Sequence, residues 1–276
     1  MQPTSLLFLL CVVWANVLMA QQPPYHWLDI VSPGQALAQR IPPPAGYERV
    51  PAKAGSFADW LRNIPLKPGN PEVRLYNGQL KGNQSAQHSV TDLDVGKRDL
   101  QQCADATMRL RAEYLLSCGA YEQIHFNFTS GDEAAYAKWK AGYRPKISGN
   151  RVNWVRSAQP NDSYASFRKY LETVYMYAGT YSLQQEMKPI PIEELQAGDV
   201  FIQGGFPGHA VMVMDVVRHP ETGIKRFLLA QSYMPAQDMH ILRNPTDASL
   251  SPWYELPAGS LYTPEWTFEA GDLRRF

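Results

Sequence analysis

Hydrophobic positions recur at helical spacing between residues 99 and 117. An apolar seam advances in steps of three and four residues, which places its members on one face of a helix: Leu100, Cys103, Thr107, Leu110 and Tyr114. The remaining faces carry charged side chains that we expect in contact with solvent: Asp105, Arg109, Arg111 and Glu113. Gly119 follows the pattern, so the sequence predicts one long helix over residues 99–117.

A second helix and several strands follow along the chain. Asp162 or Ser163 caps a segment with helical spacing, and Gly179 lies near its end. Residues 124–129 alternate between apolar and polar side chains, which is typical of a strand with one polar face. Residues 130–160 lack such a pattern, and we expect them to be irregular. Apolar runs predict strands over residues 200–202, 209–217 and 226–230.

The order of these elements, helices first and an antiparallel β-rich part afterwards, indicates an α+β fold. The sequence shows no internal repeat. Residues 21–46 are rich in Pro and Gln and predict an extended lead-in. A single α+β domain over residues 47–276 follows it.

The first twenty residues have a pattern of their own. A short polar start precedes an unbroken apolar run at residues 6–13, and the stretch closes with the small residue Ala20. This pattern is typical of a signal peptide, here residues 1–20. No later stretch reaches the ~18 apolar residues that span a bilayer. We therefore expect a periplasmic or secreted protein whose mature chain begins near Gln21 and has no integral membrane segment.

Composition narrows the classes of function. The chain has 26 Lys and Arg against 26 Asp and Glu, so no excess charge attracts nucleic acid or an anionic membrane. With 45% hydrophobic residues it is not a disordered chain. Its length of 276 residues is enough for a globular domain with a real core.

Two cysteines remain beyond the signal segment, Cys103 and Cys118. On one helix their Cα atoms would lie about 22 Å apart, whereas bridged Cα atoms lie within about 7 Å. We therefore expect Cys103 to be a free thiol. Near a helix N-terminus the pKa of a thiol is lowered, which favours the reactive thiolate. The alternative is a core cysteine on the apolar seam, because free Cys is among the most buried residue types.

His209 opens an apolar strand directly after a glycine-rich loop, residues 204–208. An imidazole there stands at the rim of a sheet, fixed by the strand and open on one side, as a general base requires. Gly208 allows a second segment or a substrate backbone to approach closely. The alternative is a structural histidine whose ring is satisfied by a loop carbonyl.

The pairs Gly198-Asp199 and Gly208-His209, each in front of an apolar strand, resemble NlpC-type and CHAP cysteine peptidases and amidases. The resemblance implies a papain-like fold in which a nucleophile-bearing helix packs on an antiparallel β-rich half. It implies that Cys103 is the nucleophile of this arrangement. The long gap between Cys103 and His209 then implies a large insertion, about residues 120–190.

The same resemblance assigns a role to Gln231, whereas a role for Gln102 follows from its place next to Cys103. Gln231 ends the strand after the histidine strand and would orient the imidazole through its amide oxygen. Gln102 would help the Cys103 backbone N–H to stabilise an oxyanion, with a solvated helix residue as the alternative.

Over most of its length the chain resembles an uncharacterised bacterial family, domain of unknown function 4846. The resemblance lies in residues 94–114, 207–213 and 229–237 and in Ser251-Pro252-Trp253-Tyr254. It implies an exported bacterial protein and no particular activity.

Two hypotheses of function follow. The first is an exported cysteine peptidase or amidase that acts on cell-wall peptides through Cys103, His209 and Gln231. The second is a non-catalytic protein on the same fold that binds cell-wall peptides or glycans, with the many aromatic residues as platforms.

Further ligand sites find less support in the sequence. Arg98 could hold a substrate carboxylate, with a solvated helix face as the alternative. Trp139 and Trp154 could stack on a ligand, although such residues are more often part of the core. The six scattered His show no metal-binding spacing, and no glycine loop for phosphate is present. We therefore predict neither a metal nor a cofactor, and the sequence identifies no protein partner.

Overall fold

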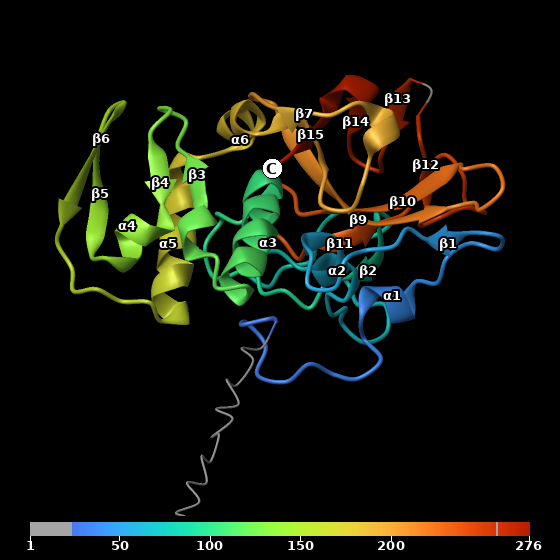
Figure 1. Cartoon of the computed structure of the whole chain (residues 1–276), viewed down its shortest axis with the longest axis horizontal. Helices are drawn as coiled ribbons and strands as arrows, with labels where there is room; N and C mark the ends of the chain where they lie inside the picture. Colours follow the sequence, from blue (N-terminus) through green and yellow to red (C-terminus); the bar gives the residue numbers. More distant parts are fainter. Residues whose placement is uncertain (1–23, 258) are drawn as a thin grey trace, which may run out of the picture.

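The structure combines helices with antiparallel sheets, as the α+β prediction states (Figure 1). The computed structural model describes residues 24–257 and 259–276, so the predicted signal peptide lies outside the described residues. The helices are α1 (Leu37–Arg40), α2 (Phe57–Arg62), α3 (Cys103–Ser117), α4 (Tyr136–Lys140), α5 (Tyr164–Tyr177) and α6 (Thr180–Glu186).

A nine-stranded antiparallel sheet dominates the described part of the chain. Its main path runs β2-β11-β10-β9-β8-β15-β7, with β1 beside β9 and β12 beside β10. Its strands are β1 (Glu48–Arg49), β2 (Gln87–Val90), β7 (Lys188–Pro189), β8 (Val200–Gln203), β9 (His209–Arg218), β10 (Lys225–Gln231), β11 (His240–Leu242), β12 (Tyr254–Glu255) and β15 (Leu273–Arg275). Three small hairpins pair β3 (His125–Asn127) with β4 (Glu133–Ala135), β5 (Tyr143–Ser148) with β6 (Arg151–Arg156), and β13 (Ser260–Tyr262) with β14 (Thr267–Glu269).

Strand β9 is buried from His209 to Val217 because both faces of the sheet are covered. Ala210, Met212 and Met214 belong to the core cluster that includes α3, whereas Val211 and Val213 pack in the opposite cluster. Residues of alternate parity point to opposite faces of a strand, so β9 is buried on both sides. This burial holds the beginning of the strand, where His209 lies, in a fixed position.

Helix α3 stands between the large sheet and the group formed by α4, α5 and the hairpins β3–β4 and β5–β6 (Figure 1). It contacts β9 and β10 on one side and α5 and α6 on the other. Helix α5 begins as predicted, because the Ser163 hydroxyl accepts a hydrogen bond from the Ser166 N–H at 3.2 Å.

The predicted start of the long helix is wrong. Helix α3 begins at Cys103, not at Asp99. The Asp105 carboxylate accepts the Gln102 backbone N–H at 3.1 Å and thereby fixes Gln102 as the residue in front of the helix. Asp99 instead accepts the Ala236 N–H at 2.7 Å, which ties the preceding segment to the loop after β10. The thiol of Cys103 therefore lies on the first helical residue.

The predicted solvated face of this helix is also wrong. Arg109 and Glu113 are fully buried, and Asp105 is buried as well. Arg109 pairs with Glu113 at 3.4 Å and with Asp94 at 2.5 Å, so its charge is compensated inside the protein. The Tyr164 hydroxyl donates to Glu113 at 2.7 Å. Charged residues on α3 thus link it to α5 and to the segment before it.

Two segments are more regular than the sequence predicts. Residues 130–160 contain β4, α4, β5 and β6. The lead-in contains α1, and Tyr25 is buried with its hydroxyl donating to the Trp60 carbonyl at 2.9 Å. Among the described residues, no helix combines the length and apolarity needed to cross a membrane.

Candidate functional site

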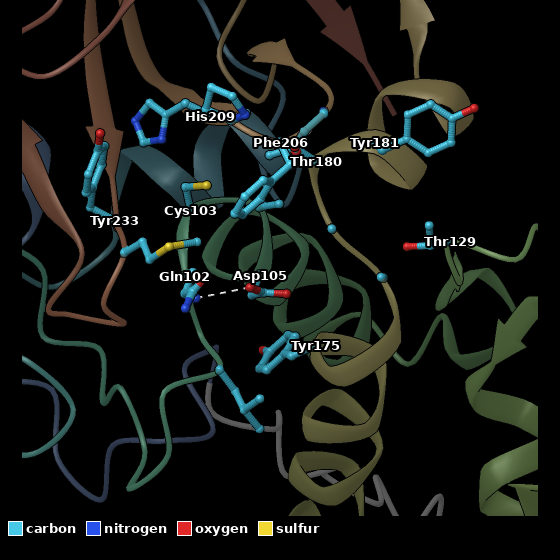
Figure 2. Close-up of a pocket in the computed structure, with 18 of the residues that line it drawn as sticks. Gln102, Cys103, Asp105, Thr129, Tyr175, Thr180, Tyr181, Phe206, His209 and Tyr233 are labelled. Atoms are coloured by element: carbon cyan, nitrogen blue, oxygen red, sulfur yellow. Dashed lines mark hydrogen bonds between the residues drawn. The ribbon is translucent and has the colours of Figure 1, made fainter. Parts of the chain in front are cut away.

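A cavity of about 720 Å³ opens at the N-terminus of α3. The beginning of α3, the start of α6, the loop in front of β9 and the loop after β10 surround it (Figure 2). Cys103 and His209, which lie 106 positions apart in the sequence, both line this cavity. The fold therefore brings together the two residues that the sequence singled out as nucleophile and base.

Cys103 is held by the helix terminus and by the start of β9. Its thiol is free, partly exposed, and within reach of the backbone N–H groups of Cys103, Ala104 and Ala210. These N–H groups lower the pKa, but burial and the nearby Asp105 outweigh them and raise the pKa of the thiol to about 11. The lowered pKa expected from the sequence is not found, and the resting form of Cys103 is the neutral thiol.

His209 is almost completely buried at the first position of β9, with 1% of its surface exposed. Aromatic rings surround its imidazole, and their centroids lie 4.8 Å (Tyr233), 5.4 Å (Trp266) and 5.9 Å (Phe268) from that of His209. Burial lowers the pKa of His209 to about 4. The imidazole is therefore neutral at physiological pH and has a lone pair available for a proton.

Gln231 contacts the His209 ring through its side-chain amide. Its Oε1 lies 2.8 Å from His209 Nε2, and because an amide oxygen only accepts, Nε2 carries the hydrogen. The lone pair is then on Nδ1. In this tautomer Nδ1 is the ring nitrogen that can accept a proton.

A buried ion pair fixes the amide of Gln231. Its Nε2 donates to Glu265 Oε2 at 2.6 Å, and the same carboxylate pairs with Lys81 Nζ at 2.5 Å. His240 offers a second, longer contact, since its Nε2 lies 3.5 Å from Gln231 Nε2 while its Nδ1 donates to the Asp238 carbonyl. With acceptors on the amine side of the Gln231 amide, its oxygen must face His209.

Gly208 is required where the loop enters β9. A Cβ atom at this position would lie 2.5 Å from Thr180 Oγ1 and 2.7 Å from the Gly205 carbonyl oxygen. The predicted close approach is therefore made by α6 and by the loop itself. It places the loop over the cavity beside His209.

Cys103 and His209 line the same cavity but are not hydrogen-bonded to each other among the described residues. In the part of the chain that the structure describes, the groups that hydrogen-bond the Cys103 thiol are backbone N–H groups, and the His209 ring is not among them. Figure 2 shows the His209 ring and the Cys103 sulfur on the same side of the cavity. Catalytic hydrogen bonds are often open before substrate binds, so this geometry suits a base that acts once the cavity is occupied.

The remaining predicted site residues lie in different places. Gln102 lines the cavity, and its side-chain amide donates to Asp99 Oδ1 at 3.0 Å. Trp139 is buried, with its Nε1 donating to Ser166 Oγ. Arg98 is exposed and pairs with Glu172 at 3.7 Å, and Trp154 lies on β6. Arg98, Trp139 and Trp154 are not among the residues that line the cavity.

Several residues of the site carry no signal in the sequence. Glu265, Lys81 and Trp266 reach the imidazole region from segments far from both Cys103 and His209. Pairing across such separations depends on sheet topology, which no local pattern encodes. Tyr233 is the one of these neighbours whose place near the site a sequence pattern can predict, because it follows the strand that ends at Gln231.

The comparisons with known proteins identify a family. A family model described as "Domain of unknown function (4846)" matches residues 37–275, so the chain belongs to this family. No curated protein matches the chain. No solved structure matches it either. Among the described residues, no group of three or more His, Cys, Asp or Glu side chains is arranged to hold a metal ion.

Proposed function

We propose that this protein is a cysteine hydrolase, a peptidase or amidase, with Cys103 as nucleophile, His209 as general base and Gln231 as the residue that orients the imidazole. The observation that carries the proposal is the shared cavity: a thiol on the first residue of a long helix and an oriented, neutral imidazole face one space. A helix packed on an antiparallel sheet with this pair at their junction is a papain-like arrangement, which we include in the proposal.

The pKa values favour a neutral resting pair. With the pKa of the thiol near 11 and that of His209 near 4, a thiol and an imidazole are the stable forms at pH 7. The thiol proton moves to His209 Nδ1 as the sulfur attacks the amide carbonyl carbon. The proton then passes to the leaving amine as the C–N bond breaks and a thioester forms. Water, deprotonated by the same imidazole, hydrolyses the thioester and restores the thiol.

The developing oxyanion has donors at the helix terminus. The Cys103 backbone N–H lies at the first turn of α3, where N–H groups have no partner inside the helix. Gln102 uses one amide hydrogen on Asp99 and keeps a second for a ligand. We propose these two groups as the oxyanion donors.

The shape of the site favours a chain-like substrate such as a peptide. A second cavity of about 280 Å³ adjoins the first, and Thr129 and Ala178 line both. It extends the space toward the turn of the β5–β6 hairpin, where Gly149 and Asn150 lie. A substrate that occupies both cavities is longer than a single amide group. Cell-wall peptides and an exported location remain our predictions for the substrate and the setting.

One observation favours the alternative of a protein that binds peptides or glycans without turnover. Burial raises the pKa of Cys103, whereas an activated nucleophile usually has a lowered pKa. On this alternative the same cavity holds the ligand, and Cys103 is an ordinary, partly covered side chain.

Alkylation by iodoacetamide at pH 7 separates the two functions, and the chain provides its own reference. Cys118 is an exposed free thiol beside Tyr114 at the other end of α3, so its rate of modification reports a cysteine that has no imidazole for a base. If His209 acts as the base, Cys103 reacts faster than Cys118 in spite of its burial, and His209→Ala slows Cys103 by about 10²-fold or more without slowing Cys118. A Cys103 thiol that stays unmodified in the folded protein, or is indifferent to His209→Ala, contradicts the enzyme proposal.

A further inference from the structure

Two large apolar side chains project into solvent at the mouth of the Cys103 cavity. Phe206 is 95% exposed and Met234 is 57% exposed, and both line the cavity. They come from different segments, the loop in front of β9 and the loop after β10. Exposed apolar groups that gather at one concave site mark a binding surface more often than scattered ones do.

The loop that carries Phe206 is tethered. The Gly204 N–H donates to Gln184 Oε1 at 2.7 Å, and the Thr180 hydroxyl donates to the Gly205 carbonyl at 3.2 Å. Gln184 and Thr180 both belong to α6, so the helix holds the loop immediately before Phe206. The exposed ring therefore stands on an anchored backbone.

The loop that carries Met234 is anchored on both sides as well. The Ser232 hydroxyl donates to the Gln101 carbonyl at 3.1 Å, and the Ala236 N–H donates to Asp99 Oδ1 at 2.7 Å. Both partners lie in the segment that leads into Cys103. The position of Met234 is thus coupled to that of the nucleophile.

The charges around the cavity add a second criterion. Among the described residues, those that line it include no Lys or Arg, and their acidic members are Asp99 and Asp105. His209 is neutral at pH 7. A substrate carboxylate in this space would lose water without gaining a cation, which is unfavourable in a partly enclosed site.

We propose that Phe206 and Met234 form a subsite that takes a large, uncharged apolar side chain, aromatic or branched aliphatic, of a peptide substrate next to the bond that Cys103 attacks. This assignment rests on the proposed function, and it deepens it by naming the substrate class. Substrates with a carboxylate at the same position are disfavoured. Phe206 and Met234 are specificity residues of the site and take no part in bond breaking.

The test uses a series of N-acetyl-aminoacyl acyloxymethyl ketones with Phe, Leu, Gly or Glu next to the ketone. The Cys103 sulfur displaces the acyloxy group as a carboxylate and forms a thioether, so mass spectrometry measures the rate at that residue. We expect the Phe and Leu probes to react about 10-fold or more faster than the Gly probe, and the Glu probe to react most slowly.

Variants locate the selectivity. Phe206→Ser combined with Met234→Ser should bring the ratio of Phe to Gly rates close to one. Ile224→Ser is the matched control, because Ile224 is also a half-exposed apolar residue but does not line the cavity, and it should keep the ratio of the wild type. Far-ultraviolet circular dichroism checks that each variant is folded.

The outcomes distinguish this subsite from the proposed function. If iodoacetamide and all four probes leave Cys103 unmodified, the enzyme proposal fails and the subsite falls with it. If iodoacetamide modifies Cys103 in a manner that depends on His209, but the wild type treats Phe, Gly and Glu probes alike, only the subsite is overturned. The same holds if the double variant keeps the preference for Phe.

Discussion

The Lys81–Glu265 ion pair holds the tautomer of His209, and its removal as a pair tests this link. The side chains of Lys81 and Glu265 are 5% and 14% exposed, so removal of one partner leaves the other charge buried. Each single change, Lys81→Met or Glu265→Met, should therefore lower the free energy of unfolding by about 3–5 kcal/mol. The double variant leaves no orphaned charge and removes the hydrogen bond that Gln231 makes to Glu265, so it should cost about 1.5–3 kcal/mol, less than either single change.

The effect on the site follows from the hydrogen bond that Gln231 loses. Its amine group donates to the charged Glu265 at 2.6 Å, and a bond of this kind contributes about 1.5–3 kcal/mol. Without it, the preference of the amide for its present orientation weakens by about 10- to 100-fold, and the contact with His240 at 3.5 Å is a weaker substitute. A reversed amide would present its N–H₂ group to His209 Nε2 and move the ring hydrogen to Nδ1, which removes the base.

Nitrogen-15 chemical shifts of the His209 ring measure the tautomer directly, and the iodoacetamide rate at Cys103 measures its consequence. In the wild type the shifts should show a protonated Nε2 and an unprotonated Nδ1. In the folded double variant both tautomers should be populated, and alkylation of Cys103 at pH 7 should slow in proportion to the fraction of His209 that no longer carries its hydrogen on Nε2. A folded double variant with an unchanged tautomer and an unchanged rate would refute the role of this ion pair.

Three further predictions concern stability and the reference thiol. Because the folded state holds His209 neutral down to about pH 4 whereas the unfolded state protonates it near pH 6.5, His209 should contribute about 3 kcal/mol to the fall in the free energy of unfolding as the pH drops through this window. The buried His240, whose pKa is lowered to about 3, adds to the same fall, so His209→Gln should reduce the fall seen by urea denaturation without abolishing it. Arg109→Leu removes the nearer of the two cations beside the fully buried Glu113, the other being Arg168 at 3.9 Å, and should cost about 3–5 kcal/mol in the same assay. Arg109→Leu with Glu113→Leu should recover part of the loss, and equal losses in both variants would contradict the pairing. Cys118→Ser, at an exposed position, should change the free energy of unfolding by no more than about 0.5 kcal/mol and leave alkylation of Cys103 unchanged.

The sequence predicts local features of this protein well where a periodic pattern or a cap defines them. Strands β8, β9 and β10 lie where apolar runs place them, and the Ser163 cap begins α5. The start of α3 was predicted too early, because the carboxylate of Asp105 fixes the residue before Cys103 and this choice depends on geometry within one turn. The charged face of α3 was assigned to solvent, because the partners of Arg109 lie on other segments.

For the candidate site too, local patterns predict some features and tertiary contacts decide the others. Cys103, His209 and Gln231 were recognisable, because each stands at the end of an element that a pattern defines. The pKa of Cys103 was expected to be low from the helix terminus alone. Burial reverses the direction, and burial follows from tertiary packing. Glu265 and Lys81 come from segments that only the folded chain brings together, so sequence reasoning had no means to find them.

The dependence of Cys103 alkylation on pH tests most directly whether a neutral His209 serves as the base for the Cys103 thiol. The wild-type rate should rise as His209 loses its proton near pH 4, stay high through neutral pH, and rise again only as the thiol itself ionises near pH 11. In His209→Ala the plateau should vanish and the alkaline rise should remain. Identical profiles for the two proteins, with the alkaline rise alone, would contradict the account.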